Sequence, residues 1–319
     1  MDKNSIIGFV LIAAVLIGFS IYSQPSEQEQ RAAFVKDSTE QANRAKAEKA
    51  VKAAEYKQRQ ALKQKVAEDT TALFHKALVG KAKNVVLSNN KVALTLSTKG
   101  ATVVKAYLKN QKGSKQFVGH NMADRSGKHD DENGVTLFEG QRQSLNYTLV
   151  AKELNISTAD LYFTPSAVTD STVTLTADAG QGKTLVFNYR LGKNYMLHLD
   201  IKATGMSGLF DPNASRINVD WHETVRQQER GFNFENRYAR LDWKNTDGGT
   251  DYLSEASSKQ ETVDERMDWV AFKNQFFSTV IISKDGFEKG ADLESTVYNK
   301  ESQDNWKVRY LKDFKANMK

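Results

Sequence analysis

The hydrophobic and polar positions divide the chain into three zones. The first ends near residue 25 and is apolar, the second runs to about residue 83 and is rich in Ala, Gln, Lys and Glu, and the third shows the period-two alternation of β-strands. Only the third zone, of roughly 235 residues, has enough Val, Leu, Thr, Tyr and Phe to form a large core. We therefore expect a membrane-spanning segment over residues 1–25, a polar helical stalk over residues 26–83, and a β-domain over residues 84–319.

The apolar segment from Ile6 to Tyr22 carries no charge. As a helix it would be about 25 Å long, near the lower limit for crossing the hydrocarbon core of a bilayer. A cleaved signal peptide is the alternative, but its apolar core is usually shorter and ends in small residues, unlike Ile21 and Tyr22. We expect an uncleaved transmembrane anchor formed by the apolar residues Ile6, Ile7, Phe9, Val10, Leu11, Ile12, Val15, Leu16, Ile17, Phe19 and Ile21.

The charges that flank this segment favour one orientation in the membrane. Lys3 precedes the segment, whereas Glu27 and Glu29 follow it. By the positive-inside tendency the N-terminus is expected in the cytoplasm. Residues after about 23 are then expected outside the cytoplasm.

The second zone has the composition of a long helix. No Gly or Pro occurs between Ser26 and Val79, and Gln41–Gln64 consists almost wholly of strong helix-forming residues. Its larger apolar residues are too sparse for a coiled-coil seam, which leaves either a spacer or interaction arm or a solvated, partly frayed helix. Near its end, four apolar residues are expected to dock on the β-domain: Leu73, Phe74, Leu78 and Val79.

Strand-like alternation begins after residue 80. Val85–Ser88 and Lys91–Ser97 flank two asparagines, which tolerate positive φ and suit a tight hairpin turn. Gly180–Lys183 lacks the spacing of a phosphate loop and is interpreted as another hairpin turn. Many strands without helical crossovers favour an antiparallel β-sandwich over a parallel α/β sheet. Further strands are expected at Thr102–Leu108, Leu145–Ala151, Val173–Ala177, Thr184–Leu191, Tyr195–Ala203 and Ile217–His222.

Charge and composition argue against several functional classes. The net charge is +6, but residues 31–83 carry 13 basic and 6 acidic residues, whereas residues 84–319 carry 31 basic and 30 acidic residues. The β-domain is therefore nearly neutral, which argues against nucleic-acid binding. The absence of cysteine excludes disulfides and thiolate sites.

Candidate catalytic or metal-binding residues are few. The histidines form no close metal-ligand motif, and His129 with the acidic residues after it is better explained as part of an exposed loop than as a cation site. Asp220, His222 and Glu223 could serve as acid or base groups in a sugar-binding sandwich. The alternation from Ile217 onward favours the simpler reading that they are surface residues at a strand end.

Arg266–Ser283 is the most hydrophobic part of the third zone. Such a density of aromatic and branched residues is typical of either a core strand pair or an exposed docking patch. The charged residues at both ends favour the core strand pair. Its aromatic residues are Trp269, Phe272, Phe276 and Phe277.

Three segments, taken in order, resemble the N-terminal half of the bacterial YidC membrane protein insertase family. They are MDKNSIIGFVLIAAVLIGFSIYSQPS at the N-terminus, LTLSTKGATVVKAYL early in the β-domain, and DWVAFKNQFFSTVII near its end. The resemblance implies a periplasmic β-supersandwich, similar in shape to sugar mutarotases, attached to a protein that inserts and folds inner-membrane proteins. The helical membrane core that performs insertion in that family is expected to lie beyond this chain.

The resemblance also implies partners: the inner membrane, nascent membrane proteins, and the Sec translocon with its SecDF subunits. It implies no enzyme activity and no cofactor. Two alternatives remain open at this stage. One is a membrane-tethered carbohydrate-binding or carbohydrate-active β-sandwich, and the other is a purely structural spacer.

Overall fold

The computed structural model describes residues 50, 53, 54, 57, 72–111, 134–150, 155–208, 217–229, 231–298 and 309–319. The chain divides into two compact units, residues 1–65 and 66–319. In the first unit the four described residues are helical. The expected anchor and nearly all of the expected stalk lie outside the described residues. Among the residues that are described, no helix is long and apolar enough to cross a membrane.

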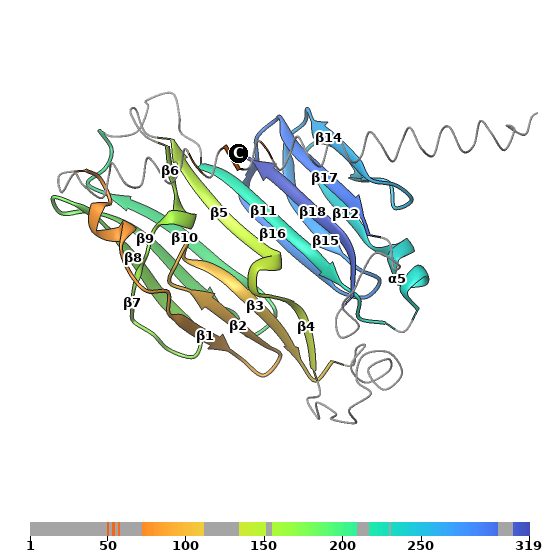
Figure 1. Cartoon of the computed structure of the whole chain (residues 1–319), viewed down its shortest axis with the longest axis horizontal. Coiled ribbons are helices and arrows are strands. Elements are labelled where there is room, and N and C mark those ends of the chain that lie inside the picture. Colours follow the sequence, from red (N-terminus) through yellow and green to blue (C-terminus); the bar gives the residue numbers. More distant parts are fainter. Residues whose placement is uncertain are drawn as a thin grey trace, which may run out of the picture. The chain divides into compact units, whose positions relative to one another are not determined.

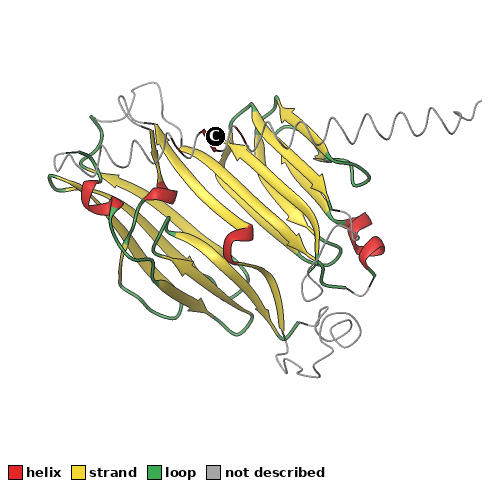
Figure 2. Cartoon of the chain, in the orientation of Figure 1, coloured by secondary structure: helices red, strands yellow, loops and turns green. Residues whose placement is uncertain are grey.

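The second unit is mainly β, and every pairing among its described strands is antiparallel, as the sequence predicts (Figure 2). The strands are β1 (Asn84–Ser88), β2 (Val92–Ser97), β3 (Thr102–Lys109), β4 (Gly134–Glu139), β5 (Gln143–Val150), β6 (Asn155–Ser157), β7 (Thr164–Ser166), β8 (Thr172–Gly180), β9 (Lys183–Leu191), β10 (Leu197–Thr204), β11 (Ile217–Arg226), β12 (Arg240–Asn245), β13 (Thr250–Tyr252), β14 (Lys259–Val263), β15 (Met267–Lys273), β16 (Ser278–Phe287), β17 (Ala291–Val297) and β18 (Tyr310–Met318). The short helical elements are η1 (His75–Leu78), η2 (Gly140–Arg142), η3 (Thr158–Asp160) and α5 (Phe232–Tyr238).

These strands form four sheets in two layers (Figure 1). The front layer contains the sheet β1-β2-β3-β4 and the six-stranded sheet β14-β17-β18-β11-β5-β6, which follow one another through η2. Behind them lie the sheets β10-β9-β8-β7 and β13-β12-β15-β16. In this back layer β10 and β16 are therefore edge strands, each hydrogen-bonded to a described strand on one side only.

Aromatic contacts join the two layers. Tyr147 of β5 meets Phe187 of β9 edge to face with ring centroids 5.4 Å apart. Trp221 of β11 stacks on Phe272 of β15 with centroids 3.6 Å apart and ring planes 14° apart. The buried residues of both layers form one continuous hydrophobic cluster, so the two back sheets share a single core with the front layer.

Both predicted hairpin turns are present, but they form by different means. The side-chain oxygen of Asn89 accepts hydrogen bonds from the backbone N–H groups of Lys91 (2.7 Å) and Val92 (2.9 Å). Neither Asn89 nor Asn90 has the positive φ that was expected, because the side-chain hydrogen bonds of Asn89 close the turn. At the second turn Gly180, Gln181 and Gly182 all have positive φ, which is the conformation that the glycines make accessible.

The last part of the predicted stalk packs on the β-domain, as expected. Phe74 is buried, and its backbone N–H donates to the carbonyl of Ala179 at 3.3 Å. Leu73 and Leu78 pack against the core. Val79 does not dock: its backbone is extended and its side chain is 70% exposed, because the chain turns away from the core after η1.

The hydrophobic segment predicted as a core strand pair forms β15, β16 and the turn between them. Phe272 is buried, Trp269 and Phe277 are half-buried, but Phe276 is 65% exposed. The expectation of a core position is therefore wrong for Phe276. The side-chain oxygen of Asn274 accepts hydrogen bonds from the N–H groups of Phe276 and Phe277, which fixes a tight turn with Phe276 at its tip.

Phe272 and Phe276 offer a matched test of this packing. Phe272→Ala removes the ring that stacks on Trp221 and should lower the free energy of unfolding by about 3–5 kcal/mol. Phe276→Ala removes an exposed ring and should change it by less than about 0.5 kcal/mol. Urea unfolding followed by tryptophan fluorescence measures both, and equal losses in the two variants would contradict the interlayer stack.

Candidate functional site: an apolar cleft beside two strand edges

A cleft of about 770 Å³ lies between the layers, where β10 and β16 border the front sheets. The front layer supplies its floor through side chains of β2, β3, β4, β5 and β11. Leu145 and Tyr147 come from β5, and Val219 and Trp221 come from β11. Because side chains alternate along a strand, these inward residues stand on the same face as the buried core. The cleft is therefore an unfilled continuation of the core.

The two edge strands meet the cleft in different ways. β10 contributes the alternate residues Leu197, Leu199 and Ile201, so it presents one face. β16 contributes every residue from Ser278 to Lys284. Successive side chains of a strand point to opposite faces of its sheet. When both sets of side chains line one cleft, the cleft lies along the edge of that strand. β16 thus presents its backbone edge to the cleft.

The surface of the cleft is apolar and accessible. Five of the large exposed hydrophobic side chains line it, and Phe276 and Ile282 are the most exposed of these at 65% and 52%. The other three are Tyr195, Met196 and Val280. Among the described residues that line it, Lys284 is the only charged one. A contiguous patch of this kind is typical of a surface that binds another apolar molecule.

Two buried polar side chains stand at the floor. Gln143 of β5 and Glu223 of β11 lie directly opposite each other in the strand register, and both are buried. Within the described part of the chain, Gln143 Oε1 and Glu223 Oε2 have no hydrogen-bond partner. Buried polar atoms are normally paired, so these two oxygens mark a place where a donor is missing. Gln143 lines the cleft itself.

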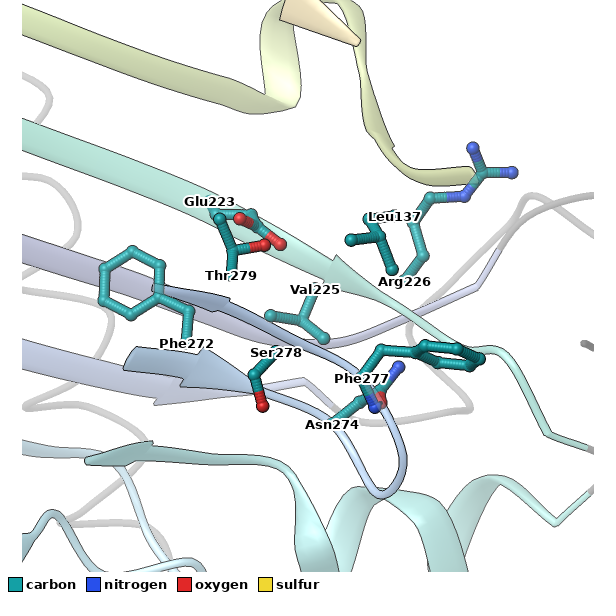
Figure 3. Close-up of a pocket in the computed structure, with 9 residues that line it drawn as sticks. All are labelled: Leu137, Glu223, Val225, Arg226, Phe272, Asn274, Phe277, Ser278 and Thr279. Atoms are coloured by element: carbon teal, nitrogen blue, oxygen red, sulfur yellow. Dashed lines mark hydrogen bonds between the residues drawn. The ribbon is translucent and has the colours of Figure 1, made fainter. Parts of the chain in front are cut away.

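Glu223 connects the floor to the edge strand. Its side chain lies close to that of Thr279 on β16, beside a cavity of about 10 Å³ that Asn274 and Phe277 also line (Figure 3). Burial raises the pKa of the Glu223 carboxyl to about 8, although the hydrogen bond with Thr279 lowers it in part. The side chain is therefore mainly neutral at pH 7. A cavity of this size is about as large as one water molecule.

The three candidate acid and base residues do not form one site. Asp220 and His222 lie on the outer, solvent-facing side of β11, whereas Glu223 points inward. Since β11 continues to Arg226, none of them lies at a strand end, and Glu223 is not a surface residue. The expected surface position is confirmed for Asp220, which is exposed, and is wrong for Glu223, which is buried. The expected strand end is wrong for all three because the strand is longer than the alternation indicated.

His222 belongs to a hydrogen-bonded group on the outer face. Its Nε2 lies 2.6 Å from Asp313 Oδ1, and the Thr224 hydroxyl donates to the same oxygen at 2.7 Å. Burial by itself raises the pKa of Asp313, but the bonds from His222 and Thr224 and the positive charge of Lys315 lower it overall. The group stabilises the pairing of β11 with β18. Among the described residues no three acidic or histidine side chains are placed to hold a metal ion. His129 lies outside them.

The burial of Glu223 could have been predicted from the sequence. The period-two pattern of β11 puts Glu223 on the same face as Val219 and Trp221, so its burial followed from the register. Nothing in the pattern marked Gln143, or showed that β10 and β16 would be edge strands, because edge and central strands can alternate alike.

Comparisons with known proteins identify the relatives of this fold. The sequence matches the family described as the YidC periplasmic domain over residues 84–318. The chain belongs to the YidC periplasmic domain family. The membrane protein insertase YidC of Phocaeicola vulgatus is 38% identical over 320 residues, covering 100% of this chain and 47% of that protein. The YidC insertase of Bacteroides fragilis is 37% identical over 326 residues, covering 100% of this chain and 48% of that protein.

The chain thus spans about half the length of the YidC relatives that it matches. Similar solved structures include a galactose mutarotase related enzyme from Lactobacillus acidophilus, at a TM-score of 0.33 and 12% identity, covering 74% of this chain and 96% of that one. A putative aldose 1-epimerase from Escherichia coli has a TM-score of 0.30 and 9% identity, covering 75% of this chain and 99% of that one. A likeness of this degree supports no conclusion about activity.

The buried carboxyl makes stability depend on pH. A carboxyl whose pKa is raised from 4.5 to about 8 by folding contributes stability that is fully present below pH 4.5 and is lost as the pH rises toward 8. The loss is about 1.4 kcal/mol per pH unit within that window. Glu223→Gln should remove this slope and increase the free energy of unfolding at pH 8.

Urea unfolding at pH 5, 6, 7 and 8 measures the slope. Glu265→Gln is the control, because this carboxyl is exposed on the same unit. If Glu223→Gln and Glu265→Gln show the same pH dependence as the unmodified chain, the buried neutral carboxyl is disproved.

Proposed function

We propose that this chain is the N-terminal half of an inner-membrane protein insertase, with an anchor in the membrane and the β-domain in the periplasm. The observation that carries the proposal is the similarity to insertases of the YidC family along the whole chain. The anchor, the cytoplasmic N-terminus and the mutarotase-like shape are finer parts of the same proposal. They rest on the apolar segment Ile6–Tyr22, its flanking charges and the resemblance of the sequence.

In this proposal the cleft receives apolar segments of proteins that are being translocated. Hydrophobic side chains line its wall and floor. Contact with these side chains is favourable for any apolar segment, regardless of its sequence. Contacts with the Sec translocon and its SecDF subunits are also proposed, on the resemblance alone.

Site-specific photocrosslinking in the full-length insertase tests the function. A photoreactive amino acid at Val280, on the wall of the cleft, should crosslink to nascent inner-membrane proteins. The same amino acid at Asp251, exposed on β13 and outside the cleft, is the control. Crosslinks to nascent chains at both positions to the same extent, or at neither, would contradict a role for the cleft.

Labelling of single cysteines tests the orientation. These 319 residues contain no cysteine, so each introduced thiol is the only one within them. Ser171→Cys, in the exposed turn before β8, should react with a membrane-impermeant maleimide in cells whose outer membrane has been permeabilised. Asn4→Cys, before the proposed anchor, should react only after the inner membrane is disrupted. Protection of Ser171→Cys in the first condition would overturn the proposed topology.

A further inference from the structure

The free edge of β16 has backbone groups that no described strand pairs. β16 bonds to β15 along the register from Ser278 to Ile282, and no other described strand pairs with it. In a strand, the N–H and C=O groups of alternate residues point to opposite sides. Half of those of β16 therefore point away from β15, and it is this side that borders the cleft.

The lining of the cleft limits what can satisfy that edge. Lys284 is the only charged residue among the described residues of the lining, and this composition favours an uncharged occupant. An acyl chain would fill apolar space but has no N–H group for the strand edge. Gln143 adds a second, independent requirement, because its buried Oε1 lines the cleft without a partner among the described residues. An occupant with hydrogen-bond donors along its length meets both requirements.

We infer that the cleft binds an extended, uncharged polypeptide segment as an added β-strand along the free edge of β16, with a side-chain donor of that segment bonded to Gln143 Oε1. This inference rests on the proposed function and specifies the conformation and chemistry of the bound segment. Main-chain hydrogen bonds supply binding that does not depend on sequence. The alternate side chains that face the floor meet Gln143 as well as Leu145 and Trp221, which favours residues such as Thr that carry both a hydroxyl and a methyl group.

The dimensions of the site fit a short segment. The part of β16 from Ser278 to Ser283 spans roughly 20 Å at about 3.3 Å per residue, which accommodates about six residues of an added strand. Leu197, Leu199 and Ile201 of β10 form the opposite wall and would cover the far side of the segment. The bound strand would thus lie between the edge of β16, which no described strand pairs on this side, and the apolar face of β10.

Peptide binding to the whole chain tests the inference. The chain is reconstituted in lipid nanodiscs, so that no detergent fills the cleft, and titrated with a blocked octapeptide of alternating Thr and Val. Two further peptides carry N-methyl groups on all Thr or on all Val residues, which removes the donors of one edge or the other. Strand addition requires that at least one N-methylated peptide binds ten or more times more weakly than the unmethylated peptide. Binding of all three within a factor of two, or no binding of the unmethylated one, overturns it.

Hydrogen exchange locates the bound peptide. The unmethylated peptide should slow amide exchange in β16 at least tenfold, and it should leave exchange in β13, which is also an edge strand of the same sheet, unchanged. Equal protection of β13 and β16, or protection of neither, contradicts pairing at the cleft.

A Gln143 variant tests the side-chain bond. Gln143→Leu removes an unsatisfied buried oxygen, so the fold should be retained. It should weaken binding of the Thr-Val peptide several-fold and leave unchanged the binding of an Ala-Val peptide, which has no side-chain donor. Equal effects on both peptides would disprove the role of Gln143.

The photocrosslinking and peptide-binding experiments distinguish a failure of the proposed function from a failure of strand addition. If photocrosslinks form at Val280 while the methylated peptides bind normally, the proposed function stands and strand addition is wrong. If peptides bind as inferred but no nascent chain reaches Val280 in cells, the cleft is a peptide site of a different function.

Discussion

The stack of Trp221 on Phe272 is the contact on which the arrangement of the two layers depends beside the cleft. It joins the central strand of the six-stranded sheet to the back sheet that ends in β16, and Phe314 of β18 lies against Phe272 on the same side. Stacked aromatic rings bury a large area and favour a limited set of orientations. The contact therefore fixes where β16 stands relative to the floor, and with it one wall of the cleft.

The cleft follows from an incomplete back layer. Two four-stranded sheets pack on one front layer, and no described strand of one is hydrogen-bonded to a described strand of the other. Leu145 and Val219 of the front layer line the space at this seam, and Tyr147 lines it too while its ring meets Phe187 of β9. The buried side chains of Glu223 and Gln143 lie at this seam, and each has one oxygen without a hydrogen-bond partner among the described residues.

Much of the local structure could be predicted from the sequence. The two hairpin turns, the pairing of β15 with β16 and the docking of Phe74 all follow from short-range patterns. The positions of β10 and β16 as edge strands could not be predicted. Alternation of hydrophobic and polar residues indicates which face of a strand is buried, but it does not indicate whether another strand pairs with it. Phe276 was assigned to the core for its hydrophobicity, whereas the Asn274 turn, a local hydrogen-bonding preference, decides its exposure. Glu223 shows the opposite error, since a charged residue type suggested the surface and the register put it inside.

The open edge of β16 also bears on how the chain avoids associating with itself. An exposed apolar strand edge is a template on which other chains can pair, and continuous stacks form from segments of about six or seven residues that combine high β-propensity with low net charge. Here the apolar run is Val280-Ile281-Ile282, and Ser283, Lys284 and Asp285 follow it directly. Charged residues that flank a hydrophobic strand act as gatekeepers against aggregation. Lys284 and Asp285 therefore oppose the stacking of further chains, while the edge from Ser278 to Ser283 can still pair with one segment.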